Sequence, residues 1–325
     1  MIPLGGRMGR WVALRTIIAS CAGMLVAACS SASYEAPVAK FAAATDAAEA
    51  SLAKLNADIG KAYWDVQKAR LGRGDLLLIE QDGDCNIGSA RCRLVIEDRQ
   101  GQRIPYTDRG PLENALEVMA AISAYADGLA AIIAADTAQA VEGHVNTTLG
   151  NVQKLAATVA AAGGSPAGTG PDFAAPAAQL VNWVVGRYVE KVKLGALRRA
   201  TAEAAPVIRE AAELFGRASF FAVSGTRSEL TARVRTEIDA LGPTPAPAII
   251  ERAAAAARTY DVFLQSDPAA AFKAMAKAHT ALADNLADRN VSFASMAAEI
   301  ERFVTEAEKL VQAAKQVSAL LDKKE

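Results

Sequence analysis

The sequence predicts a mainly α-helical protein, an elongated bundle of long helices with coiled-coil-like packing and one small disulfide-closed β-hairpin insertion. Hydrophobic residues make up 52% of the 325 residues but aromatic residues only 6%, and alanine supplies the difference. Alanine has the highest helix propensity and lets helices approach closely. Apolar residues also recur at helical spacing along most of the chain, whereas one segment has short β-type runs on both sides of a turn-rich stretch.

The first 28 residues have the pattern of an export signal. Arg7, Arg10 and Arg15 precede the apolar stretch Thr16–Ala28, and a basic start followed by a short apolar run is typical of secretory signals. A membrane-spanning helix needs about 20 apolar residues, and this run is shorter. A retained signal anchor is the alternative, but polar residues follow at once without a basic cluster.

The end of the signal carries a recognisable tetrapeptide, Val26-Ala27-Ala28-Cys29. It resembles the lipobox of bacterial lipoproteins, which has an aliphatic residue, two small residues and a cysteine. The resemblance implies cleavage between Ala28 and Cys29 and attachment to the lipid bilayer through a diacylglyceryl group, with or without an N-acyl chain, on Cys29. It also implies that Ser30, in a Gram-negative cell, directs the protein to the outer membrane, facing the periplasm. We expect no other cofactor.

Cleavage would change both the organisation and the charge of the chain. We expect a signal peptide at 1–28, a lipidated N-terminus and short tether at 29–37, and a helical bundle over 38–325. The signal holds three arginines and no acidic residue, so its removal changes the net charge from −1 to −4. This balance gives no reason to expect a nucleic-acid partner.

The first helix is predicted over 38–70, with Gly72 as its C-cap. Apolar or small residues follow a 3,4 spacing for more than four heptads, which indicates a packing seam. The seam consists of Val38, Phe41, Thr45, Ala48, Leu52, Leu55, Ile59, Ala62, Val66 and Ala69.

A β insertion is predicted at about 75–107, where short β-type runs flank a turn-rich stretch. Cys85 and Cys92 lie at opposite ends of that turn. In an oxidising compartment we expect them to form a disulfide, which would stabilise the fold by about 2–3 kcal/mol. A zinc site or redox catalysis is the alternative, although two thiols without a nearby histidine make a poor metal site.

Helices are predicted for nearly all of the remaining chain. A flexible linker is expected at about 163–176, a kink or break at Pro206, and a chain break at 242–247. The expected helical ranges are 111–162, with softening at Gly143 or Gly150, then 176–241, 248–265, 268–288 and 292–321.

Enzyme signatures are missing from the sequence. It has no P-loop, no H-E-x-x-H and no G-x-S-x-G motif. Its two histidines, His144 and His279, are expected to be surface or core residues, with a metal pair across the bundle as the alternative. We therefore expect no catalytic residue and no metal.

One segment combines basic and aromatic residues. Between 180 and 200 lie Trp183, Arg187, Tyr188, Lys191 and Lys193. Such a set can hold a helix on an anionic membrane surface or contact a partner. The alternative, which the apolar stripe favours, is a core helix whose basic residues pair with acidic neighbours in the bundle.

These observations favour a non-enzymatic, membrane-anchored envelope lipoprotein, a scaffold or protein-interaction bundle. Envelope proteins are its expected partners, and oligomerisation through helix faces is open. A membrane-active protein resembling α-helical pore-forming proteins is one alternative. A periplasmic ligand-binding or sensor bundle is the other.

Overall fold

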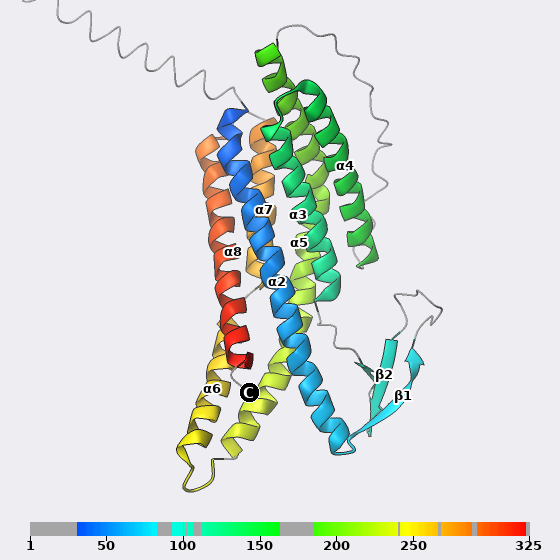
Figure 1. The fold of residues 1–325 in the computed structure, drawn as a ribbon, viewed down its shortest axis with the longest axis vertical. Helices are drawn as coiled ribbons and strands as arrows, with labels where there is room; N and C mark the ends of the chain where they lie inside the picture. Colours follow the sequence, from blue (N-terminus) through cyan, green and yellow to red (C-terminus); the bar gives the residue numbers. More distant parts are fainter. Residues whose placement is uncertain are drawn as a thin grey trace, which may run out of the picture.

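The protein is an elongated bundle of α-helices with a small antiparallel sheet near one end (Figure 1). The computed structural model describes residues 31–82, 93–99, 101, 103–106, 112–162, 185–239, 241–265, 268–287 and 291–322. The helices are α2 (Ala32–Gly72), α3 (Glu113–Ala134), α4 (Ala138–Ala161), α5 (Val185–Asp239), α6 (Pro247–Gln265), α7 (Pro268–Ala287) and α8 (Phe293–Asp322). The prediction of a mainly helical bundle is confirmed.

Helix α2 begins earlier than expected, at Ala32 instead of Val38. Residues 32–37 of the expected tether are therefore helical, and Pro37 lies within the helix. The predicted seam is confirmed at the six positions whose side chains the structure describes. These buried positions are Val38, Phe41, Thr45, Ala48, Leu52 and Leu55.

Helix α2 ends at Gly72, as predicted, and Gly74 forms the turn that follows. Gly74 has a φ of 71°, and its N–H donates to the Leu71 carbonyl at 2.9 Å. Glycine adopts this left-handed conformation without a steric penalty, which explains why the helix can stop here. Arg99 closes the turn by donating from Nε to the Gly74 carbonyl at 3.0 Å.

The predicted β insertion is confirmed as a three-stranded antiparallel sheet of order β1-β2-β3. The strands are β1 (Leu76–Asp82), β2 (Arg93–Asp98) and β3 (Arg103–Tyr106). Val95 and Ile96 are buried. Cys85 and Cys92 lie outside the described residues, so their disulfide stays a prediction.

The prediction of one helix over 111–162 is wrong, because the chain reverses at 135–137. Thr137 is the N-cap of α4, and its side chain accepts a hydrogen bond from the Ala140 N–H at 3.1 Å. A threonine cap satisfies one of the free N–H groups of the first turn. Gly143 and Gly150, where softening was expected, lie inside α4.

Helix α5 is continuous over 55 residues, and the break expected at Pro206 does not occur. Proline removes the hydrogen bond to the carbonyl four residues earlier, which belongs to Ala202. Both Pro206 and Ala202 are exposed, so water can satisfy that carbonyl. The linker expected at 163–176 lies outside the described residues. After the expected break at 242–247, α6 begins at Pro247.

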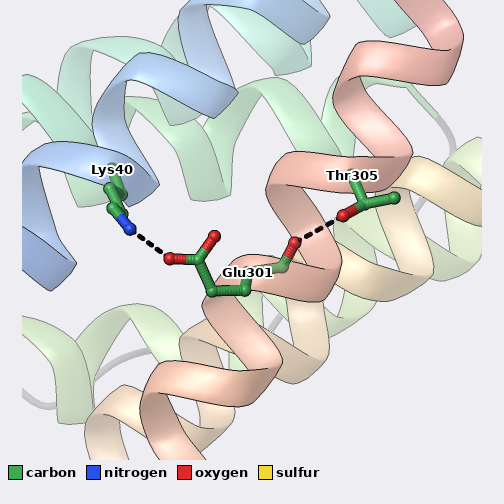
Figure 2. Close-up of polar contacts among 3 residues, drawn as sticks. All are labelled: Lys40, Glu301 and Thr305. Carbon is green, nitrogen blue, oxygen red and sulfur yellow. Dashed lines mark hydrogen bonds and ion pairs between the residues drawn. The ribbon is translucent and has the colours of Figure 1, made fainter.

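The first and last helices of the bundle, α2 and α8, lie side by side (Figure 1). On α8, Ile300, Phe303 and Leu310 are buried, as their spacing predicts. On the exposed side of the contact, Lys40 of α2 pairs with Glu301 of α8, and Thr305 donates to the Glu301 carbonyl at 2.9 Å (Figure 2). Exposed ion pairs stabilise little, so the buried seam holds these helices together.

Helices α3 and α4 are in close contact at Gly128. A Cβ at this position would lie 3.1 Å from both Cβ and Cγ2 of Thr148, and closer still to its Oγ1. Thr148 is itself fixed, because its hydroxyl donates to the His144 carbonyl at 2.6 Å. Only glycine therefore fits between the two helices here.

The variant Gly128→Ala should lower the free energy of unfolding by about 1–3 kcal/mol, because the added methyl group overpacks the contact. Gly143→Ala is the matched control: nothing lies within 4 Å of its Cβ, so higher helix propensity should stabilise by about 0.5–1 kcal/mol. Urea denaturation measures both. Stabilisation by both substitutions would contradict the close approach.

Candidate functional site

The start of α2 is bound to α5 through one carboxylate. Both the backbone N–H and the hydroxyl of Ser31 donate to Oε2 of Glu190, the N–H at 2.8 Å. Lys193 lies one helical turn later, with its Nζ 3.7 Å from the other oxygen of Glu190. The Ser31 hydroxyl lowers the pKa of Glu190, against the opposing effect of desolvation and with further help from the Ser31 N–H and Lys193. A charged Glu190 therefore holds the beginning of the described chain.

The same end of the bundle is joined to the turn between α7 and α8. The Tyr34 hydroxyl donates to Oδ1 of Asn285 at 2.7 Å, and Nδ2 of Asn285 donates to the Val291 carbonyl at 2.6 Å. The Tyr34 ring meets the edge of Phe293, with centroids 5.9 Å apart. Phe293 nevertheless stays 42% exposed. This surface, formed by Tyr34, Asn285, Val291 and Phe293 beside the Ser31–Glu190 contact, is called the N-terminal end surface below.

The sequence-predicted basic and aromatic set lies partly in this region. Trp183 and the side chain of Arg187 are outside the described residues. Tyr188 is half-buried, Lys191 is exposed and Lys193 is buried.

The described part of this segment packs as a core helix. Val189 and Leu197 are buried. Arg199 pairs with Glu203 at 2.9 Å, and Arg198 donates from Nε to the Leu286 carbonyl at 2.7 Å. These contacts are those of the alternative interpretation, in which the basic residues bind within the bundle. Among the described side chains of the predicted basic and aromatic set, that of Lys191 is exposed, whereas those of Tyr188 and Lys193 are not.

The remaining sequence-predicted site residues cannot be placed. Ala28, Cys29, Cys85 and Cys92 all lie outside the described residues. Signal cleavage, lipidation and the disulfide are therefore not tested by the structure.

A second polar feature lies deep in the core. Nε2 of His279, on α7, is 2.8 Å from the Tyr125 hydroxyl of α3, and both side chains are fully buried. The His279 ring also lies 6.0 Å from the Phe41 ring of α2. Its other nitrogen, Nδ1, is buried without a hydrogen-bond partner. Burial lowers the pKa of His279 to about 3 and raises that of Tyr125, so both groups are neutral at pH 7.

The two histidines occupy different environments. His144 is half-exposed on α4, whereas His279 is enclosed among aromatic side chains. Within the described ranges, no three His, Cys, Asp or Glu residues are grouped so that they could hold a metal ion. The Tyr125–His279 pair is a structural element of the core and lies out of reach of solvent.

Sequence reasoning missed both Tyr125 and the Ser31–Glu190 contact. A signal existed for the first, because Tyr125 lies in the apolar 3,4 spacing of Val118, Ile122, Leu129 and Ile132, all buried. His279 occupies the same kind of position on α7. No signal existed for the second, since a serine and a glutamate 159 residues apart show no pattern.

Helix α3 is long and apolar enough to cross a membrane, judged by length and composition alone. Within the bundle, however, 61% of its apolar stretch is buried. A core helix with the same composition has no need of a membrane.

Comparison with known proteins gives no match: no family model, no curated protein and no solved structure is similar to this chain.

The His279 environment predicts acid destabilisation. In the unfolded chain a histidine takes up a proton below pH 6.5, but the folded state resists protonation down to about pH 3. The contribution of His279 to the free energy of unfolding should therefore change little just above pH 7 and fall as the pH decreases, by about 2 kcal/mol between pH 7 and pH 5. Urea denaturation at several pH values measures this slope.

The variant His279→Gln tests whether His279 causes the acid destabilisation, because the amide can still hydrogen-bond to Tyr125 but does not titrate. It should show a flatter stability profile between pH 6.5 and pH 5. An equal slope in both proteins would assign the acid sensitivity to other groups.

Proposed function

We propose that this protein is a non-enzymatic, membrane-anchored envelope lipoprotein whose bundle serves as a scaffold for other envelope proteins. One observation supports it most strongly. Ser31, which is hydrogen-bonded to Glu190 of α5, comes only two residues after the expected lipobox cysteine, Cys29. Helix α2 starts at one end of the elongated bundle, while the sheet and the α5–α6 turn lie toward the other (Figure 1). An anchor at Cys29 would thus present the far end of the bundle away from the membrane.

The far end offers a surface suited to a protein partner. Ile238 of α5 and Ile250 of α6 are 51% and 47% exposed, two of the exposed large hydrophobic residues in the described chain. Glu237 and Arg252 pair beside them at 3.3 Å and link the two helices. Exposed apolar side chains with charged neighbours are common where proteins bind one another.

Location follows from the anchor. By its resemblance to bacterial lipoproteins, with Ser30 after the cysteine, the protein would reside in the outer membrane of a Gram-negative cell and face the periplasm. Two or more acyl chains suffice for stable attachment, since each buried CH₂ contributes about 0.8 kcal/mol.

The variant Cys29→Ser should abolish labelling by a radioactive or clickable fatty acid and should release the protein from washed membranes. Cys21→Ser is the matched control, because this cysteine lies inside the expected signal. Labelling and membrane recovery should be unchanged in the control. Persistent acylation of Cys29→Ser would contradict the lipobox interpretation.

The disulfide belongs to the same proposal, because the periplasm is oxidising. Asp82 and Arg93 are paired across β1 and β2, so the segment that carries Cys85 and Cys92 connects two strand ends that lie side by side. Both thiols should resist alkylation in the native protein and react after reduction. Mass spectrometry of iodoacetamide-treated protein measures this, and ready alkylation before reduction would exclude the bond.

The scaffold role is tested by crosslinking in the intact envelope. A photo-crosslinking amino acid in place of Ile250 should capture one dominant partner, or a second copy of the chain. The same amino acid in place of Gln153, which is exposed on α4, is the control and should not capture it. Equal, diffuse crosslinking at both positions would argue against a partner at the far end.

A membrane-active role is the second candidate, supported by the length and apolar composition of α3. In that case α3 would have to leave the core and abandon the Tyr125–His279 contact. The unlipidated mature protein should then release dye from liposomes. Intact liposomes would favour the scaffold.

A further inference from the structure

The expected anchor, Cys29, lies close in the sequence to a residue that is bound to the bundle. Helix α2 begins at Ala32, three residues after Cys29. Two residues of chain span at most about 7 Å, so an acylated Cys29 could not lie far from Ser31. Ser31 itself is bound twice to Glu190 of α5. A lipid on Cys29 would therefore be joined to two helices of the bundle and not to a flexible tether.

One part of the N-terminal end surface is suited to a membrane contact. Residues 291–298 carry no charged side chain, and Phe293 in this stretch is 42% exposed. Two exposed acidic residues, Glu35 and Asp284, lie next to Tyr34 and Asn285 in the sequence. The Tyr34 ring packs against the Phe293 ring in a T-shaped contact. Burying the Phe293 ring and the uncharged side chains of residues 291–298 in the headgroup region incurs no cost of desolvating a charge. Lys191 lies one residue after Glu190 and is exposed, so it can reach anionic headgroups.

We propose that this end surface rests directly on the lipid bilayer, so that the bundle stands with its long axis along the membrane normal. The inference rests on the lipid anchor proposed above. Its occupant is the headgroup region of the membrane that holds the acyl chains. Helix α5, with 55 residues, would then extend about 80 Å from the membrane at 1.5 Å per residue.

Two contacts together produce this orientation. The acyl chains alone would leave the bundle free to tilt about Cys29. The Ser31–Glu190 bonds limit the free chain on the α5 side to the two residues before Ser31, and Phe293 provides a second point of contact on the α7–α8 side. Tyr34 and Asn285 connect the two points, because the tyrosine hydroxyl donates to the amide of Asn285.

Neutron reflectometry of the lipidated protein on a supported bilayer tests the orientation. We expect a protein layer about 80 Å thick. A bundle lying flat would give a layer of about 30 Å, the width of three helices, and would overturn the inference.

Glu190→Ala removes the acceptor for both Ser31 donors. Because the bundle could then tilt, the protein layer should become thinner and its outer edge less sharp. Glu301→Ala is the matched control, since it removes an exposed α2–α8 ion pair (Figure 2) but leaves the junction intact. It should keep the wild-type thickness. Thermal unfolding of both variants verifies that the bundle is folded. An unchanged layer in folded, acylated Glu190→Ala would exclude the junction as the cause.

The contact itself is measured by ¹⁹F NMR on vesicles that contain a gadolinium-chelating lipid. A fluorinated phenylalanine replaces either Phe293 or Ile250, with the rest of the lipidated chain unchanged. The signal at position 293 should broaden strongly and the one at 250 should stay sharp. Equal broadening in an acylated protein would overturn the bilayer contact while leaving the anchor proposal intact. Absence of the acyl group would instead refute the anchor, and the inference with it.

Discussion

The contact among Phe41, Tyr125, His279 and Phe303 joins four helices that are far apart in the sequence. The Phe41 ring lies 5.6 Å from Phe303 and 6.0 Å from His279, which in turn lies 5.6 Å from Tyr125. Leucine, isoleucine and methionine side chains such as Leu52, Ile122 and Met275 are also fully buried in the core. Aromatic rings bury about 150–250 Å² each, and this cluster is the place where ring contacts connect α2, α3, α7 and α8.

The position of the N-terminal end surface depends on the register that this cluster imposes. A slide of α2 by one heptad would move it about 10 Å along the bundle and would separate Ser31 from Glu190. The same slide would remove Tyr34 from Asn285 and Phe293. The buried aromatic contact thus determines which residues meet at the end of the bundle, ten residues away along α2. The hydrogen bonds of Ser31 to Glu190 and of Tyr34 to Asn285 then hold the start of α2 against α5 and α7.

Sequence patterns predicted those parts of the fold that depend on local periodicity. The seam of α2, the buried face of α8 and the β insertion all follow from apolar spacing within a single segment. The turn at 135–137 was not predicted, because alanine continues on both sides and the only stop signal is the Thr137 cap. Of the candidate site, the sequence pointed to Lys191, which is exposed, whereas the Ser31–Glu190 contact pairs residues from distant segments and Cys29 stays a prediction.

The sequence by itself determined the helical class, the position of the expected anchor and the small insertion, because each depends on composition, spacing or a local motif. Only the tertiary structure decided which helices are neighbours and which polar groups meet. Alanine-rich faces are nearly interchangeable, so helix order and register depend on a few large side chains and their partners across the bundle. His279 is an example: the sequence places it on an alanine-rich helix without a distinguishing pattern, and the structure buries it in contact with Phe41 and Tyr125.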